Sequence, residues 1–77
     1  MMNRYKNRFA VPLAQLGMRQ VDLLYEIQKR GYPRLNQQQL SAYARGATVG
    51  PQADAVLKLG DAIIDEWKHQ RGKRLAQ

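Results

Sequence analysis

Three consecutive glutamines, residues 37–39, lie near the start of a short polar segment, residues 36–46, whose residue types and spacing suit contacts with nucleobases. They follow Asn36, a good helix N-cap, and the segment ends at Gly46, where a helix C-terminus favours left-handed dihedral angles. A glutamine amide carries a donor and an acceptor, the two groups needed to contact N6 and N7 of adenine in the major groove. A helix that starts with amides and ends on Arg45 is well suited to that groove. The alternative is a solvated surface helix or turn.

The residues ahead of this segment extend the pattern. Gly17, Met18 and Gln20 open an earlier helical stretch, which a turn separates from the glutamine-led helix. That second helix carries Asn36, Gln37, Gln38, Leu40, Tyr43 and Gly46. In this order the residues resemble the helix-turn-helix of temperate-phage repressors and Cro proteins, the Cro/C1-type (XRE-like) family. The resemblance covers about residues 13–67.

The resemblance implies a sequence-specific DNA-binding transcriptional regulator, a Cro-like repressor that occupies a short duplex operator and occludes a promoter. It also implies a phage, prophage or mobile-element origin. Gln20 would hydrogen-bond a phosphate, and Gln37 and Gln38 match positions that touch base edges. Ala42 matches a position that often carries a longer base-reading side chain, so we expect only apolar contact there, for instance with a thymine methyl group.

Small and basic residues complete the expected interface. Ser41 and Ala42 lie on the helix face opposite its apolar residues, where they let the backbone approach DNA closely or simply fill an exposed surface. Arg19, Arg45 and the N-terminal basic residues would position the DNA backbone without specifying sequence. The predicted DNA-binding set is Arg19, Gln20, Gln37, Gln38, Ser41, Ala42 and Arg45.

The formal net charge of +7 is unevenly distributed. Basic residues dominate residues 1–45, including an N-terminal arm at 1–7, and return in a tail at 70–77, whereas residues 46–67 are acidic. Concentration of positive charge around the candidate helix-turn-helix favours a polyanionic partner, because neutralised phosphates release counterions. A membrane surface is the competing polyanion, but the sequence lacks a strongly basic amphipathic helix.

Catalytic and metal chemistry find little support, so we expect neither an enzyme nor a cofactor. The chain has no cysteine and a single histidine, His69, which excludes disulfides and thiolate metal sites. Asp61, Asp65 and Glu66 could do acid–base work, but neighbouring lysines favour a solvated helix face. No apolar run is long enough to span a membrane, and no signal peptide is evident, so we expect a soluble cytoplasmic protein.

Periodicity predicts one domain of four to five helices, all-α and compact, with the helix-turn-helix at 19–45 and a long C-terminal helix. In the first helix, Pro12 either introduces a kink or lies in a first turn that begins near Val11. The second helix, about 19–30, buries Val21, Leu23, Leu24 and Ile27. A loop at 31–35, longer than the family's usual turn, precedes the third helix at about 37–45, whose core residues are Leu40, Tyr43 and Ala44, with Leu35 packing from the loop.

The last helix should begin at Pro51 and run to about His69. Its apolar stripe comprises Ala53, Val56, Leu57, Gly60, Ile63, Ile64 and Trp67. A core this small, without disulfides or metals, often relies on oligomerisation, so we expect a homodimer. Ile63, Ile64 and Trp67 are the predicted dimer interface, with Leu75 as a possible extension.

Two other functions compete with DNA binding. A phage-encoded adaptor or inhibitor could use the helix-turn-helix scaffold on a protein target, with Trp67 and Ile64 as its apolar contact. An RNA-binding module would need exposed aromatic residues for base stacking, and Tyr5, Tyr25 and Tyr32 are the only candidates.

Overall fold

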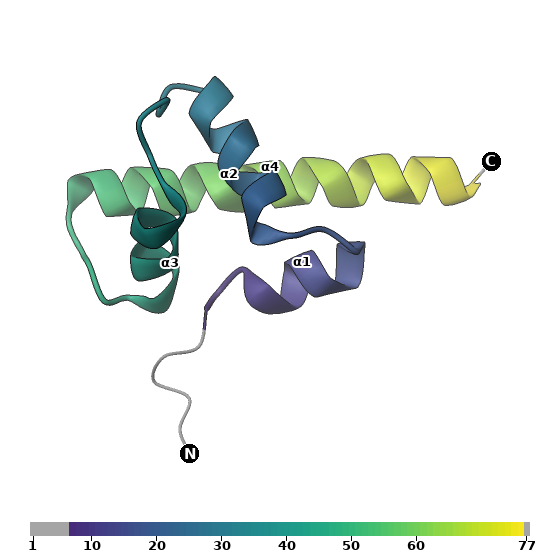
Figure 1. Ribbon diagram of the computed structural model, residues 1–77. Helices are drawn as coiled ribbons and strands as arrows, with labels where there is room; N and C mark the ends of the chain where they lie inside the picture. Colours follow the sequence, from purple (N-terminus) through teal and green to yellow (C-terminus); the bar gives the residue numbers. More distant parts are fainter. Residues whose placement is uncertain (1–6, 77) are drawn as a thin grey trace, which may run out of the picture.

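The computed structural model describes residues 7–76, with side chains up to Gln70. It contains four α-helices and no strand within those residues: α1 (Ala10–Leu16), α2 (Gln20–Lys29), α3 (Gln37–Arg45) and α4 (Pro51–Ala76). The first three helices pack against α4, whose last turns project beyond them (Figure 1). The predicted all-α architecture of four to five helices is confirmed, with four helices in the described residues. The N-terminal basic arm and its Tyr5 fall mostly outside the described residues.

Local sequence signals determine where α2 and α3 begin and end. The Asn36 side chain accepts a hydrogen bond from the Gln39 backbone N–H at 2.8 Å, which caps α3 as predicted. Gly46 ends α3 with φ +79°, a left-handed conformation that glycine adopts without strain. At the start of α2, Asp22 accepts a hydrogen bond from the Arg19 backbone N–H at 2.9 Å. The sequence therefore predicted both helices to within one residue at each end.

The first helix settles the two alternatives for Pro12. Because α1 begins at Ala10, Pro12 lies in its first turn, where a backbone N–H would have no partner within the helix. The helix therefore needs no kink. Phe9, just before it, is fully buried, and Leu13 is buried one turn later.

One apolar core lies between α4 and the other three helices. The buried apolar residues are Phe9, Leu13, Leu23, Leu24, Ile27, Leu35, Leu40, Tyr43, Ala44, Ala53, Val56, Ile63 and Ile64. This set includes every predicted core residue of α3 and its preceding loop. Val21 and Leu57 depart from the prediction, because both are only half-buried.

Gly60 of α4 packs directly against the ring of Phe9. A Cβ atom at residue 60 would lie 2.7 Å from Cζ of the Phe9 ring, which is nearer than carbon atoms pack. A glycine in mid-helix costs about 1 kcal/mol relative to alanine. The buried ring of Phe9 fills the space that this glycine leaves open.

The long α2–α3 connection is held against the motif helices. Its Leu35 is buried, and the Leu35 carbonyl accepts a hydrogen bond from the Gln28 side chain of α2 at 2.8 Å. The Leu35 backbone N–H in turn donates to the Tyr32 carbonyl at 3.1 Å. The long loop therefore forms a defined turn that packs into the core.

The C-terminal helix requires two corrections to the predictions. It continues to Ala76, where the sequence suggested a solvated tail from residue 70. Ile63 and Ile64, predicted at a dimer interface, are 0% and 4% exposed, so they belong to the monomer's own core. Both side chains pack into the core between α4 and the other helices instead of facing outward. Trp67 is half-buried against the same core, and the Leu75 side chain is outside the described residues.

Candidate nucleic-acid interface

Five of the seven predicted DNA-binding residues line one open hollow of about 540 Å³. Gln20 contributes from the start of α2, and the others come from α3: Gln37, Gln38, Ser41 and Arg45. They meet because α2 and α3 pack on each other through their apolar faces, which leaves the start of α2 beside the exposed side of α3. The lining combines amide, hydroxyl and guanidinium groups without a carboxylate.

The three glutamines of α3 differ in their hydrogen bonds. The Gln39 amide oxygen accepts from the Asn36 backbone N–H at 3.2 Å, so this side chain completes the helix cap. Gln37 and Gln38 are exposed, and neither side chain makes a hydrogen bond to the residues that the structure describes. Their donors and acceptors are therefore open to an external partner.

Arg19 and Ala42 are the two predicted residues outside the lining of this hollow. The Arg19 side chain is 79% exposed, with only a distant 3.7 Å approach to Asp22. Ala42 and its neighbour Ser41 are half-buried, which corrects the prediction of a freely exposed face at these two positions. The Ala42 carbonyl accepts the Ala47 backbone N–H at 2.9 Å, so the chain that follows α3 folds back toward Ala42.

Asn7 is a site residue that the sequence interpretation missed, because it was assigned to the basic arm. Its side-chain NH₂ donates to the amide oxygen of Gln20 at 2.7 Å. Its own side-chain oxygen accepts the Phe9 backbone N–H at 2.8 Å. The second bond is a local asparagine turn ahead of a helix, a signal present in the sequence. The first joins residues 13 apart in the chain, and no local pattern predicts it.

The basic residues divide into paired and unpaired groups. Arg8 pairs with Asp61 of α4 at 2.6 Å, and Arg30 makes two hydrogen bonds, of 3.0 and 2.9 Å, to Glu66. Through these bonds, Arg30 lowers the pKa of the Glu66 carboxyl, and Glu66 raises the pKa of the Arg30 guanidinium. Such cations are tied to the protein's own carboxylates and are less available to phosphates.

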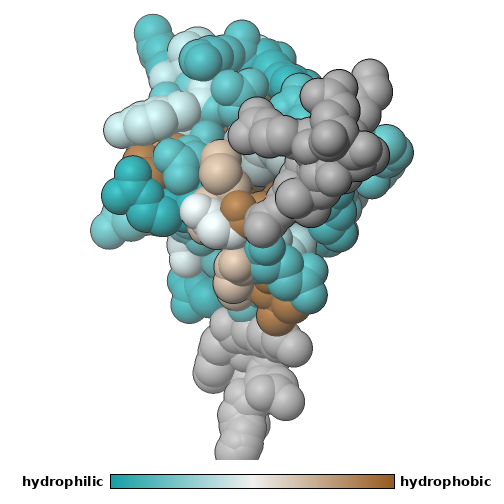
Figure 2. All heavy atoms as spheres, turned by 90° about the vertical axis from the view of Figure 1, so that its right-hand side faces the viewer, coloured by the Kyte–Doolittle hydropathy of each residue, from teal (hydrophilic) through white to brown (hydrophobic). Residues whose placement is uncertain are grey.

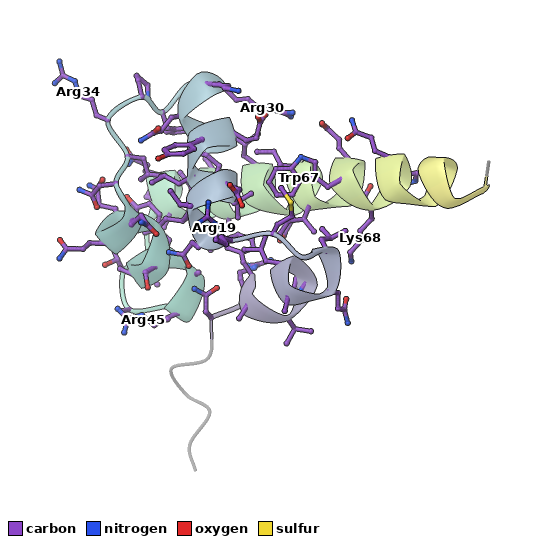
Figure 3. The ribbon with its side chains drawn as sticks, turned by 45° about the vertical axis from the view of Figure 1, so that its right-hand side comes forward. Arg19, Arg30, Arg34, Arg45, Trp67 and Lys68 are labelled. Carbon is purple, nitrogen blue, oxygen red and sulfur yellow. The ribbon has the colours of Figure 1, made fainter. Side chains whose placement is uncertain are left out.

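Arg34 and Arg45 have no carboxylate partner among the described residues. Arg34 comes from the loop before α3 and Arg45 from its last turn, and both point outward from the α3 side of the molecule (Figure 3). Arg45 also donates to the Ser41 carbonyl at 3.3 Å, which holds it along the helix. The sequence interpretation did not single out Arg34, whose position depends on the long α2–α3 loop.

The surface at the opposite end of the molecule carries scattered apolar residues (Figure 2). Seen toward the projecting end of α4, apolar residues form small brown and tan patches bordered by hydrophilic ones, outside the area that the grey atoms cover (Figure 2).

Within the described residues, no group of acidic, histidine or cysteine side chains could hold a metal ion. In the same range, no helix combines the length and apolar character needed to cross a bilayer.

Comparisons with known proteins add no evidence about the function of this chain. No family model, curated protein or solved structure matches the chain.

Proposed function

We propose that this protein binds duplex DNA sequence-specifically and acts as a Cro-like repressor in the cytoplasm. The observation that supports this function is the shared hollow of Gln20, Gln37, Gln38, Ser41 and Arg45. An α-helix fits the major groove, and the exposed start of α3 would enter it. A bound protein there would occlude a promoter that overlaps its operator.

The side chains around the hollow divide into base-reading and phosphate-contacting groups. Gln37 and Gln38 have unused amides, each able to pair with the N6 and N7 edge of an adenine. Arg34 and Arg45, near the two ends of α3, would contact phosphates on either side of the groove, and Arg19 would add a further contact. Ala42 offers apolar contact only, so specificity rests mainly on the two glutamines.

Two copies of the chain would be needed for useful specificity. One short helix reads only a few base pairs, which is too little to distinguish an operator from competing genomic sites. We therefore include a homodimer on DNA in the proposal. Trp67 remains a candidate contact, whereas Ile63 and Ile64 are withdrawn because they are buried within one chain.

Binding as a function of salt concentration tests the proposal. Fluorescence anisotropy with a selected duplex, its single strand and the matching RNA should show tightest binding to duplex, with log affinity falling linearly with log salt. A slope of about −4 to −7 corresponds to about four to eight phosphate contacts. A flat salt response or no duplex binding would refute the proposal. Preference for RNA would favour an RNA-binding module, and failure with every nucleic acid would favour a protein target.

Matched arginine variants sharpen this test. Arg34→Gln and Arg45→Gln should each reduce the salt slope by about 1 and weaken binding to all duplexes similarly. Arg30→Gln removes the same charge, but that guanidinium is held by Glu66. Arg30→Gln should therefore change the salt slope less than the other two variants do, and it should lower the folding stability. Equal slopes for all three variants would remove the assignment of Arg34 and Arg45 to phosphates.

A further inference from the structure

Asn7, Phe9 and Gln20 form a chain of two hydrogen bonds beside the hollow, called here the Asn7 clasp. A backbone N–H can only donate, so the Asn7 atom that meets the Phe9 N–H must be its side-chain oxygen. The Asn7 NH₂ group therefore faces Gln20, and the Gln20 atom that meets it must be the amide oxygen. One unambiguous donor thus fixes the orientation of both amides, which geometry alone often leaves open.

The clasp leaves the NH₂ group of Gln20 unengaged. No hydrogen bond from it to the described residues occurs, and Gln20 is half-buried at the edge of the hollow. A phosphate oxygen can only accept hydrogen bonds, so a phosphate-contacting glutamine must present its NH₂ group and not its oxygen. The orientation that Asn7 imposes is the one that a phosphate requires.

We infer that Asn7 is a positioning residue, which holds the Gln20 amide with its donor group directed toward a backbone phosphate of bound duplex DNA. This inference rests on the proposed function. Fixing the amide before binding removes part of the entropy cost of ordering a flexible side chain at the interface. Asn7 itself is ordered by its bond to the Phe9 N–H, immediately before α1, so the buried Phe9 anchors the whole chain of contacts.

Asn7→Asp is the variant that separates positioning from folding. Its carboxylate still accepts the Phe9 N–H, but it has no NH₂ group to offer Gln20. The Gln20 amide should then turn, donate its own NH₂ to Asp, and present its oxygen outward. We expect duplex affinity to fall roughly 10- to 150-fold, the loss typical of one hydrogen bond to a charged group. The added negative charge contributes to that loss and must be measured separately.

A double-mutant cycle with Gln20→Ala makes that separation. In the Gln20→Ala background, Asn7→Asp can act only through its charge, so its effect there should be several-fold smaller than in the wild type. Asn7→Ser, which keeps an acceptor for the Phe9 N–H and adds no charge, should weaken binding modestly without lowering the unfolding midpoint. Equal effects of Asn7→Asp in both backgrounds would overturn the inference.

Nuclear magnetic resonance of the free protein tests the clasp without DNA. In Asn7→Asp, the side-chain NH₂ protons of Gln20 should shift and exchange more slowly with water, because they become hydrogen-bonded. Unchanged Gln20 signals would show that no clasp exists, even if duplex binding is confirmed. Failure of the wild type to bind any duplex would refute the proposed function and the phosphate role together, whatever the Gln20 signals show.

Discussion

Neighbouring glutamines in α3 have the same chemistry but different environments. Gln37 and Gln38 project from the exposed start of the helix, while the Gln39 side chain turns back to the Asn36 backbone N–H. A side chain that completes a cap is not available to a base without loss of that cap. The run of three glutamines therefore leaves two side chains available for the proposed base contacts and uses one to complete the helix cap.

Alanine substitutions should separate these roles. Gln37→Ala and Gln38→Ala are expected to cost about 1–3 kcal/mol on the preferred operator and to relax base preference at one position each, because a bidentate contact is lost. Gln39→Ala is the matched control, which should lower the thermal midpoint without changing base preference. Selection from a random duplex library, followed by sequencing, measures that preference. A uniform loss of affinity on every sequence would contradict the assignment for Gln37 and Gln38.

At the scale of elements, α4 is the helix against which the other helices pack, and Gly60 is a position in it without room for a side chain. A Cβ there would meet the Phe9 ring at 2.7 Å, and that ring is completely buried. Replacing a mid-helix glycine by alanine stabilises the helix by about 1 kcal/mol, whereas overpacking a core destabilises the fold by about 1–3 kcal/mol. The packing cost should prevail.

We expect Gly60→Ala to lower the free energy of unfolding by up to about 2 kcal/mol, measured by urea denaturation. Phe9→Leu shortens the opposing side chain, so it should cost less in the Gly60→Ala background than in the wild type. Gly72→Ala, in the last turns of the same helix, serves as the propensity control and should be neutral or stabilising. Stabilisation by Gly60→Ala would mean that the ring has room to move.

The features that the sequence predicted are those determined within a few residues. Asn36 and Gly46 bounded α3, Pro51 began α4, and Pro12 was compatible with a first turn. The candidate glutamines followed from the same local order. The contacts that were missed join distant segments: Phe9 with Gly60, and Asn7 with Gln20. Periodicity gives the direction of a face but not its partner, which also explains why Ile64 was assigned to an interface.

Contacts between distant segments also decide which cations remain available to phosphates, because a cation can pair with a carboxylate of another helix. Arg30 at the end of α2 holds Glu66 of α4 by two hydrogen bonds and lowers the pKa of its carboxyl below the ordinary 4.5. A carboxyl whose pKa is lower in the folded state stabilises the fold above its unfolded pKa. That contribution is lost as the pH falls through the folded value.

Glu66→Gln should therefore have a lower melting temperature than the wild type at pH 7. The difference should shrink as the pH falls below about 4.5 and vanish once Glu66 is protonated in both states. Thermal unfolding followed by circular dichroism at a series of pH values measures this difference. Because the pair is on the surface, 1 M salt should also reduce the difference at pH 7. A melting-temperature difference that widened as the pH fell would mean that loss of the pairing with Arg30 is not the cause of the effect.

At the scale of the whole molecule, each copy offers one helix, α3, for the proposed base contacts, and its core already buries Ile63 and Ile64. With those side chains buried in the core, half-buried Trp67 is the one predicted interface residue whose described side chain is still partly exposed. We therefore expect pairing to be weak in solution and to strengthen on DNA, where two copies read adjacent half-sites. For helix-turn-helix dimers these half-sites lie about 34 Å apart, or one turn of the duplex.

Operators with altered spacing test this arrangement. Inserting half a turn, about five base pairs, between the selected half-sites should abolish cooperative binding, because the two copies would face opposite sides of the duplex. Trp67→Leu, which keeps an apolar side chain against the core, should reduce cooperativity while leaving affinity for a single half-site unchanged. Sedimentation of the complex should give two copies per operator. Full affinity for an isolated half-site, bound by one copy and insensitive to spacing, would mean that the monomer is the functional unit.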